Sequence, residues 1–133
     1  MNLSANEIAS TLRKAGRGAG LDDGTAHDVA AAALRATAAG EDGVAEALRL
    51  FDEPDAARSL VAVADLLAAG ETAEVPSSML VPFLTDDAEA PHGAYAVDTG
   101  SWERILLFAH RTYVPASEAS RLAGAGAGTT DND

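Results

Sequence analysis

The chain has 133 residues, a formal net charge of −12 and no cysteine. The length predicts one compact domain. The absence of cysteine excludes a disulfide framework and thiolate-bound zinc or iron–sulfur clusters, so a metal site would need histidine and carboxylates alone. An acidic surface repels phosphate backbones, and no apolar stretch approaches the roughly 20 residues that cross a bilayer. We therefore expect a cytoplasmic protein that binds neither nucleic acid nor membrane and holds no metal and no cofactor.

Alanine supplies 31 of the apolar side chains, so large apolar side chains are scarce. A core built from alanine buries little area, and we expect a homo-oligomer or a protein partner to supply the missing stability. The charges are also unevenly placed, because no Lys or Arg lies between Arg58 and Arg104. A GC-rich genome is the favoured explanation for this composition, and adaptation to high salt is the alternative.

Four helices are predicted in the first half of the chain. A capping box at Ser4–Glu7 starts the first helix, which Gly16 would end, and a second capping pattern at Thr25–Asp28 starts the next. A third helix is expected over 41–51 and a fourth over 54–70, where apolar residues recur every three or four positions. We therefore predict a helical bundle for this half of the chain.

The periodicity changes in the second half. Residues 79–83 alternate, and the proline within them favours an edge strand or an extended loop. Residues 94–97 and 105–114 are predicted to form two antiparallel strands around a turn at 98–101, followed by a short helix over 117–123. The predicted fold class is α+β, with a bundle of about four helices, a small antiparallel β unit and a short C-terminal helix. The domain would span residues 1–123, before a Gly-rich acidic tail at 124–133.

A candidate anion-binding site lies in the joint after the first helix. Arg17 stands beside Gly18 and Gly20, whose exposed backbone amides could hold a phosphate or carboxylate together with the guanidinium. Arg111 is a second candidate anion clamp. The alternative is an ordinary interhelical turn in which Arg17 pairs with a nearby aspartate, and this alternative is favoured because the sequence lacks a Walker motif.

Histidine is the residue type best suited to proton transfer near neutral pH, and the chain has three. His110 lies at the end of the most apolar predicted strand, and His27 stands beside Asp28 in a predicted first helical turn. His110, His27 and Asp28 are weak catalytic candidates. A solvated histidine is the commoner situation for His110, and the sequence shows no Ser-His-Asp or paired-carboxylate constellation.

Two stretches carry a resemblance to a known family. They are the N-terminal NEI…KAGRGAG and the C-terminal VPASEASRLAGAGAGTTDND. The chain resembles, over about its first 50 and last 20 residues, a bacterial family known only as domain of unknown function 3726. The resemblance implies that Lys14, Arg17 and the terminal stretch distinguish this type of protein. It also implies that the tail docks onto the domain or a partner, through Arg121, Gly124, Gly126, Asp131 and Asp133.

Three functions remain open from the sequence. The leading hypothesis is an accessory or interaction subunit that works with a metabolic partner protein. The alternative is an isomerase, lyase or hydratase of a small carboxylate, with Arg17 or Arg111 as anion clamp and His110 or His27 as the proton-transfer group. The third is a protein that binds a divalent cation through carboxylates alone.

Overall fold

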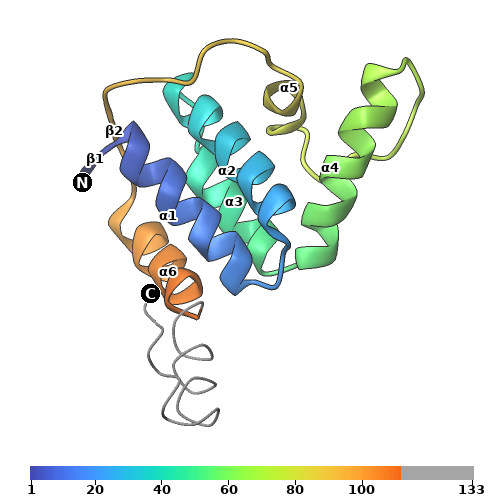
Figure 1. Cartoon of the computed structure of the whole chain (residues 1–133). Coiled ribbons are helices and arrows are strands. Elements are labelled where there is room, and N and C mark those ends of the chain that lie inside the picture. Colours follow the sequence, from blue (N-terminus) through green and yellow to red (C-terminus); the bar gives the residue numbers. More distant parts are fainter. Residues whose placement is uncertain (112–133) are drawn as a thin grey trace, which may run out of the picture.

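The computed structural model describes residues 1–111, which form six helices and a two-stranded sheet (Figure 1). Helices α1 to α4 follow one another along the chain, and α5 and strand β2 precede the last described helix, α6. The elements are β1 (Asn2–Ser4), α1 (Ala5–Gly18), α2 (Asp23–Ala38), α3 (Gly43–Phe51), α4 (Pro54–Ala68), α5 (Val81–Leu84), β2 (Ala94–Ala96) and α6 (Thr99–His110).

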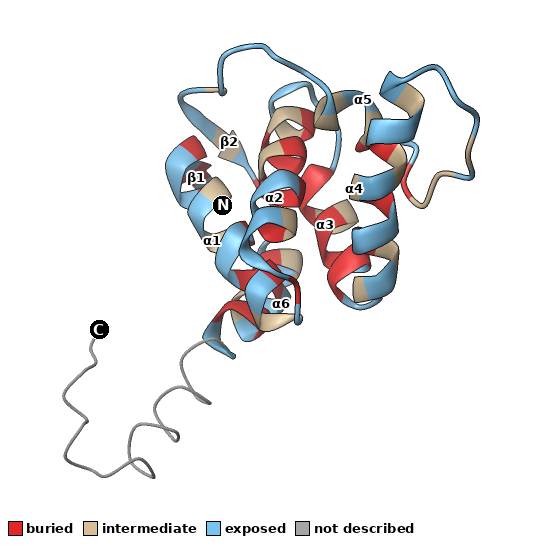
Figure 2. Ribbon diagram, turned by 45° about the vertical axis from the view of Figure 1, so that its right-hand side comes forward, coloured by how far each residue is buried: buried red, intermediate tan, exposed pale blue. Residues whose placement is uncertain are grey.

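The core lies where α1, α2, α3 and α6 meet. Ile8 and Leu12 of α1 are fully buried because they recur one turn apart on a single face of the helix. Phe51 of α3 and Phe108 of α6 meet edge to face, with ring centroids 6.1 Å apart. Figure 2 shows the buried residues on the inner faces of these helices and exposed residues on their outer faces. The small side chains of α2 let its neighbours approach closely, and six of its seven buried residues after Gly24 are alanine or valine.

The sheet joins segments that lie far apart in the sequence. Strand β1 pairs antiparallel with β2, and Leu3 lies opposite Tyr95. The N-terminal amine of Met1 extends the pairing by donating to the Val97 carbonyl at 3.1 Å. This ribbon ties the start of α1 to the start of α6, so that α6 packs along α1 (Figure 1).

The predicted α+β class is confirmed: the first half of the chain forms four helices, and a small antiparallel sheet is present, although α6, which packs against α1 and α3, contributes more to the core than α4 does. The fourth helix begins at Pro54 as predicted and ends at Ala68, two residues before Gly70, whose φ of +86° suits the turn that follows. The predicted helix over 117–123, and the boundary between domain and tail at residue 123, lie outside the described residues.

The prediction of a strand over 105–114 is wrong within the described residues, because residues 99–110 form α6. Asp98 does not begin a hairpin turn. Its carboxylate accepts a hydrogen bond from the Ser101 N–H at 2.8 Å and caps the helix. The buried residues of α6 also have helical spacing: they are Trp102, Ile105, Phe108 and Ala109. The true partner of β2 is β1, which the sequence pattern did not reveal.

The first helix begins as predicted, because the Ser4 Oγ accepts a hydrogen bond from the Glu7 N–H at 3.0 Å. The prediction that Gly16 ends it is wrong. Gly16 is buried inside α1, where an added Cβ would lie 2.8 Å from the Ala26 Cβ, so this glycine serves helix packing.

Two further local predictions are wrong. Helix α2 begins at Asp23, ahead of the Thr25–Asp28 pattern, because Asp22 caps it by accepting from the Thr25 N–H at 3.4 Å. Residues 79–83 form turns and the start of α5 instead of a strand. Proline is favourable in the first turn of a helix, where its missing N–H costs nothing, and Pro82 occupies that place in α5.

Candidate functional site

The predicted anion-binding residues lie near the C-terminal end of α1, but they serve different contacts. Gly18 packs against α6 so closely that an added Cβ would lie 1.7 Å from the Phe108 carbonyl oxygen. Arg111 lies beside Gly18 and places its guanidinium 4.4 Å from the centre of the Phe108 ring. The Gly20 carbonyl accepts a hydrogen bond from Arg58. Gly18 and Arg111 are thus brought together, at a helix-packing contact.

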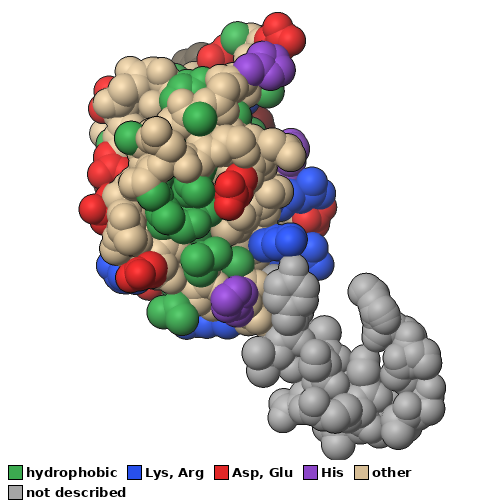
Figure 3. All heavy atoms as spheres, turned by 90° about the vertical axis from the view of Figure 1, so that its left-hand side faces the viewer, with side chains coloured by type: hydrophobic (Ala, Val, Ile, Leu, Met, Phe, Trp, Pro, Cys, Tyr) green, Lys and Arg blue, Asp and Glu red, His purple; other side chains and the backbone are tan. Residues whose placement is uncertain are grey.

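Arg17 pairs with an aspartate, as the alternative to the anion site predicts. Its Nε lies 4.0 Å from Asp23, while Arg13, one turn earlier on α1, makes a two-pronged contact with the same carboxylate. The hydrogen bond from Arg13 is the main reason why the pKa of Asp23 lies below its ordinary value. The same interaction raises the pKa of Arg13. Figure 3 shows Lys and Arg side chains at the right-hand edge of the face that it presents, with others at the lower left and at the bottom.

A groove between α1 and α2 brings together an arginine and a histidine. Its volume is about 190 Å³, and it is lined by Asn6, Ala9, Ser10, Arg13, His27, Ala30 and Ala31. Ala30 is buried and Ala9 and Ala31 are half-buried, whereas Arg13 and His27 are exposed. Sequence reasoning missed Arg13 at this place. The feature of the sequence that could have indicated Arg13 is its spacing from Arg17. The two residues are one helical turn apart, which puts both side chains on the face that Asp23 reaches.

The other histidine candidates lie elsewhere. His110 is exposed in the last turn of α6, and Asp28 is exposed on α2 beside His27. His92 lies in the loop before β2, within 3.4 Å of Glu89. The structure therefore brings His27, and not His110, to a groove that also contains an arginine.

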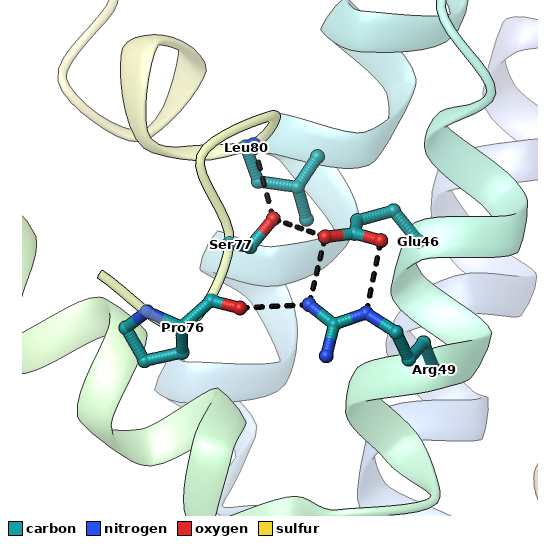
Figure 4. Close-up of polar contacts among 5 residues, drawn as sticks. All are labelled: Glu46, Arg49, Pro76, Ser77 and Leu80. Atoms are coloured by element: carbon teal, nitrogen blue, oxygen red, sulfur yellow. Dashed lines mark hydrogen bonds and ion pairs between the residues drawn. The ribbon is translucent and has the colours of Figure 1, made fainter. Parts of the chain in front are cut away.

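A buried serine anchors the connector after α4 to helix α3 (Figure 4). The Ser77 side chain donates to Glu46 at 2.5 Å and accepts from the Leu80 N–H at 3.2 Å. Arg49 binds the same carboxylate through two nitrogens and donates to the Pro76 carbonyl at 2.7 Å. Ser77 is 2% exposed, the one buried polar residue among those that the structure describes.

This cluster is suited to holding the chain and is poorly suited to acid–base chemistry. Arg49 first, and Ser77 after it, lower the pKa of Glu46 by hydrogen bonding to the carboxylate. A carboxylate stabilised in this way is a weak base, and a serine that is 2% exposed cannot reach a substrate in solution. We call these residues the Ser77 clip: Glu46, Arg49, Pro76, Ser77 and Leu80.

A second cavity of about 190 Å³ lies where the starts of α3 and α6 meet. Three carboxylates line it, from Glu41, Asp42 and Asp98, but the two aspartates cap the helices. The N–H of Ser101 lowers the pKa of Asp98 by donating to its carboxylate. Within residues 1–111, no group of three or more histidines and carboxylates is arranged to hold a metal ion.

Helix α4 carries a partly exposed, uncharged face that the sequence analysis missed. Its buried side chains are Ala57, Leu60 and Ala64, and no residue of α4 after Ala64 is buried. A second face shows the spacing i, i+3, i+4, i+7 and carries no charge. We call it the outer α4 face, and it consists of Ser59, Ala62 and Leu66, which are exposed, and Val63, which is half-buried. Leu66 is 42% exposed, and Figure 1 shows the end of α4 standing apart from the bundle.

A family of proteins of unknown function, DUF3726, matches residues 3–90 of the chain. The chain belongs to this family. No curated protein and no solved structure gives a significant match. In this member of the family, the matched residues include the α1–α2 groove, the Ser77 clip and the outer α4 face, and helix α6 lies beyond them.

The proposed docking residues of the tail, Arg121, Gly124, Gly126, Asp131 and Asp133, lie outside the described residues, as does the whole C-terminal motif at 114–133. Among the helices that the structure describes, none has the length and apolar character needed to cross a bilayer.

Proposed function

We propose that this protein is an accessory subunit that binds a partner protein, and that the outer α4 face makes the contact. The observation that carries the proposal is Leu66, which keeps 42% of its surface exposed at the end of a helix that leaves the bundle (Figure 1). Apolar surface that stays open to water costs free energy, which a partner recovers by covering it.

The attachment of α4 supports this role. The helix has 15 residues but buries only three side chains, so it contributes little to the core for its length. The Ser77 clip then fixes the connector that returns from α4 to the bundle, so the helix is held at both ends. A held but largely uncovered helix is suited to presenting a surface without a large ordering cost on binding.

The test compares two exposed leucines. Tagged wild-type protein, a Leu66→Ser variant and a Leu107→Ser variant are used to capture partners from the source cell, and light scattering after size exclusion gives the mass of each. Leu107 of α6 is 65% exposed and serves as the control. We expect a specific co-purifying protein that Leu66→Ser loses and Leu107→Ser retains. Monomeric wild-type protein with no partner, or equal loss in both variants, contradicts the proposal.

A second candidate function is supported by the α1–α2 groove. There Arg13 could bind a small carboxylate while His27 moves a proton, which is the chemistry of an isomerase, lyase or hydratase. Arg13 already donates a hydrogen bond to the Asp23 carboxylate, so a substrate would have to compete with Asp23 for the guanidinium. Binding of succinate followed by NMR tests this function: the His27 ring signals should shift, and Arg13→Gln should abolish the shift. Equal shifts at His27 and His92 would indicate a general salt effect and contradict it.

A further inference from the structure

The end of α4 is unusual among the longer helices in its charges. Helices α1, α2 and α3 each carry an arginine in the last turn, where its positive charge offsets the negative end of the helix dipole, and α6 carries His110 there. The last turn of α4 has no basic residue. The negative end of this helix is therefore left to solvent or to a positive group from outside the described residues.

Three carboxylates add to this negative charge. Asp65 precedes Leu66 in the helix, and the backbone N–H of Glu71 donates to the Leu66 carbonyl at 3.0 Å, so the backbone of Glu71 lies beside that of the same leucine. Glu74 follows three residues later in the connector. All three are exposed, and none makes an ion pair with another residue in the part of the chain that the structure describes. Leu66 thus lies in a stretch of chain, residues 65–74, that carries three carboxylates and no basic residue.

We propose that the outer α4 face binds a basic amphipathic helix of a partner protein. The apolar side chains of the partner helix would contact Val63 and Leu66, and its Lys or Arg side chains would lie at the C-terminal end of α4. This proposal rests on the proposed function and adds the chemistry of the partner. The i, i+3, i+4, i+7 spacing of the face is that of a helix prepared to pack on another helix. A positive side chain would satisfy both the helix dipole and the carboxylates.

A second copy of this chain is a poorer occupant of the face. Two copies meeting through α4 would bring Asp65 and Glu71 of each together, and each chain carries a net charge of −12. Opposing carboxylates repel, and no basic residue lies between Arg58 and Arg104 to relieve the repulsion. An anionic membrane surface is disfavoured for the same reason.

The test uses the full chain and a fluorescent model peptide of about 18 residues, which is long enough to form a helix on contact. The peptide is made of leucine and lysine, with leucines at helical spacing, and two controls accompany it. One has the same composition in scrambled order, and the other has glutamate in place of lysine. Anisotropy titrations give the affinities, and circular dichroism shows that each variant is folded.

We expect saturable binding of the patterned peptide, which Leu66→Ser weakens about fivefold because less apolar surface is buried. Glu71→Lys should also weaken it, whereas Glu103→Lys on α6, with the same change in net charge, should weaken it much less. Equal binding of the scrambled peptide, or equal effects of the two lysine variants, overturns the proposal by showing general charge attraction. A dimer that Leu66→Ser dissociates also overturns it, in favour of a second copy.

The two levels of the proposal fail separately. If a cellular partner is captured through Leu66 but the patterned peptide does not bind, the accessory function stands and the basic helix is the wrong occupant. If neither is observed, both are wrong.

Discussion

Gly18 of α1 lies against the backbone of Phe108 in α6. A Cβ added to Gly18 would come within 1.7 Å of the Phe108 carbonyl oxygen, so only glycine allows the two helices to approach this closely. The contact also positions the Phe108 ring, which meets Phe51 in the core and stacks beneath Arg111. The residue that the sequence suggests as an anion ligand therefore has a clear role in packing.

A Gly18→Ala substitution should push α6 away from α1. We expect a loss of about 2 kcal/mol in the free energy of unfolding, because a methyl group cannot fit against a backbone carbonyl. Chemical denaturation followed by tryptophan fluorescence measures this loss, since Trp102 lies on α6. Gly24→Ala in α2 is the control: its added Cβ meets only the Asp22 side chain, at 3.4 Å, and should leave stability unchanged or raise it.

The Ser77 clip should contribute measurably to stability. Ser77→Ala removes one hydrogen bond to Glu46 and leaves the buried Leu80 N–H without its acceptor, so we expect a loss of about 1–2 kcal/mol. Ser78→Ala, at the exposed neighbouring position, is the matched control. A double-mutant cycle with Glu46→Gln should give a coupling energy clearly different from zero. Additive effects would show that the two side chains do not interact in solution.

The clip also predicts a pH dependence. The pKa of Glu46 is lowered in the folded protein, so its ionised form stabilises the fold above the unfolded pKa of about 4.3. This contribution is lost as the pH falls through the lower, folded value. Glu46→Gln should therefore be less stable than wild type at neutral pH, and the difference should shrink as the pH falls below about 4. A difference in melting temperature that is constant from neutral to acid pH would contradict this.

The helical structure of residues 99–110 can be tested by removing the side chain of Asp98, which caps α6. Asp98→Ala should lower the melting temperature and the helical signal in circular dichroism, because the first turn of α6 loses the acceptor for the Ser101 N–H. Asp87→Ala, at an exposed loop position, should change neither. If residues 98–101 were instead a turn before a strand over 105–114, removing Asp98 would leave the helical signal unchanged.

Salt should stabilise the protein modestly. The five arginine–carboxylate ion pairs among the described residues are largely exposed and weak, whereas the net charge of −12 repels itself throughout the molecule. Screening by salt therefore weakens the repulsion among the carboxylates by more than it weakens the attraction within the ion pairs. We expect the melting temperature to rise with sodium chloride while the fold persists at low salt. Unfolding on removal of salt would instead support salt adaptation as the origin of the acidity.

The helices of the first half could be predicted because their signals are local. The Ser4 cap, the spacing of Ile8 and Leu12, and Pro54 in a first turn each act within a few residues. The error at 105–110 arose because a short apolar run is compatible with either a strand or a buried helix. The cap at Asp98 and the spacing of Trp102 and Ile105 carried the information that decides between them.

The candidate site was less predictable because its parts come from different elements. His27 was a candidate, but its neighbour in the groove is Arg13, which the packing of α1 on α2 brings there. Ser77 gave no signal, since the meaning of a serine in a polar connector depends on the glutamate that lies 31 positions earlier in the chain. The outer α4 face was visible as a spacing, but only its exposure shows that nothing within residues 1–111 covers it.

The sequence by itself determined the charge, the α+β class and the starts of several helices, because these depend on composition and on contacts within one helical turn. The tertiary structure decided that β1 pairs with β2, that Gly18 packs on Phe108 and that α4 leaves Leu66 exposed. Each of these depends on which distant segments share the limited apolar surface of an alanine-rich chain. Because large apolar side chains are so few, they bury the inner faces of α1, α2, α3 and α6, and the outer part of α4 stays exposed to solvent.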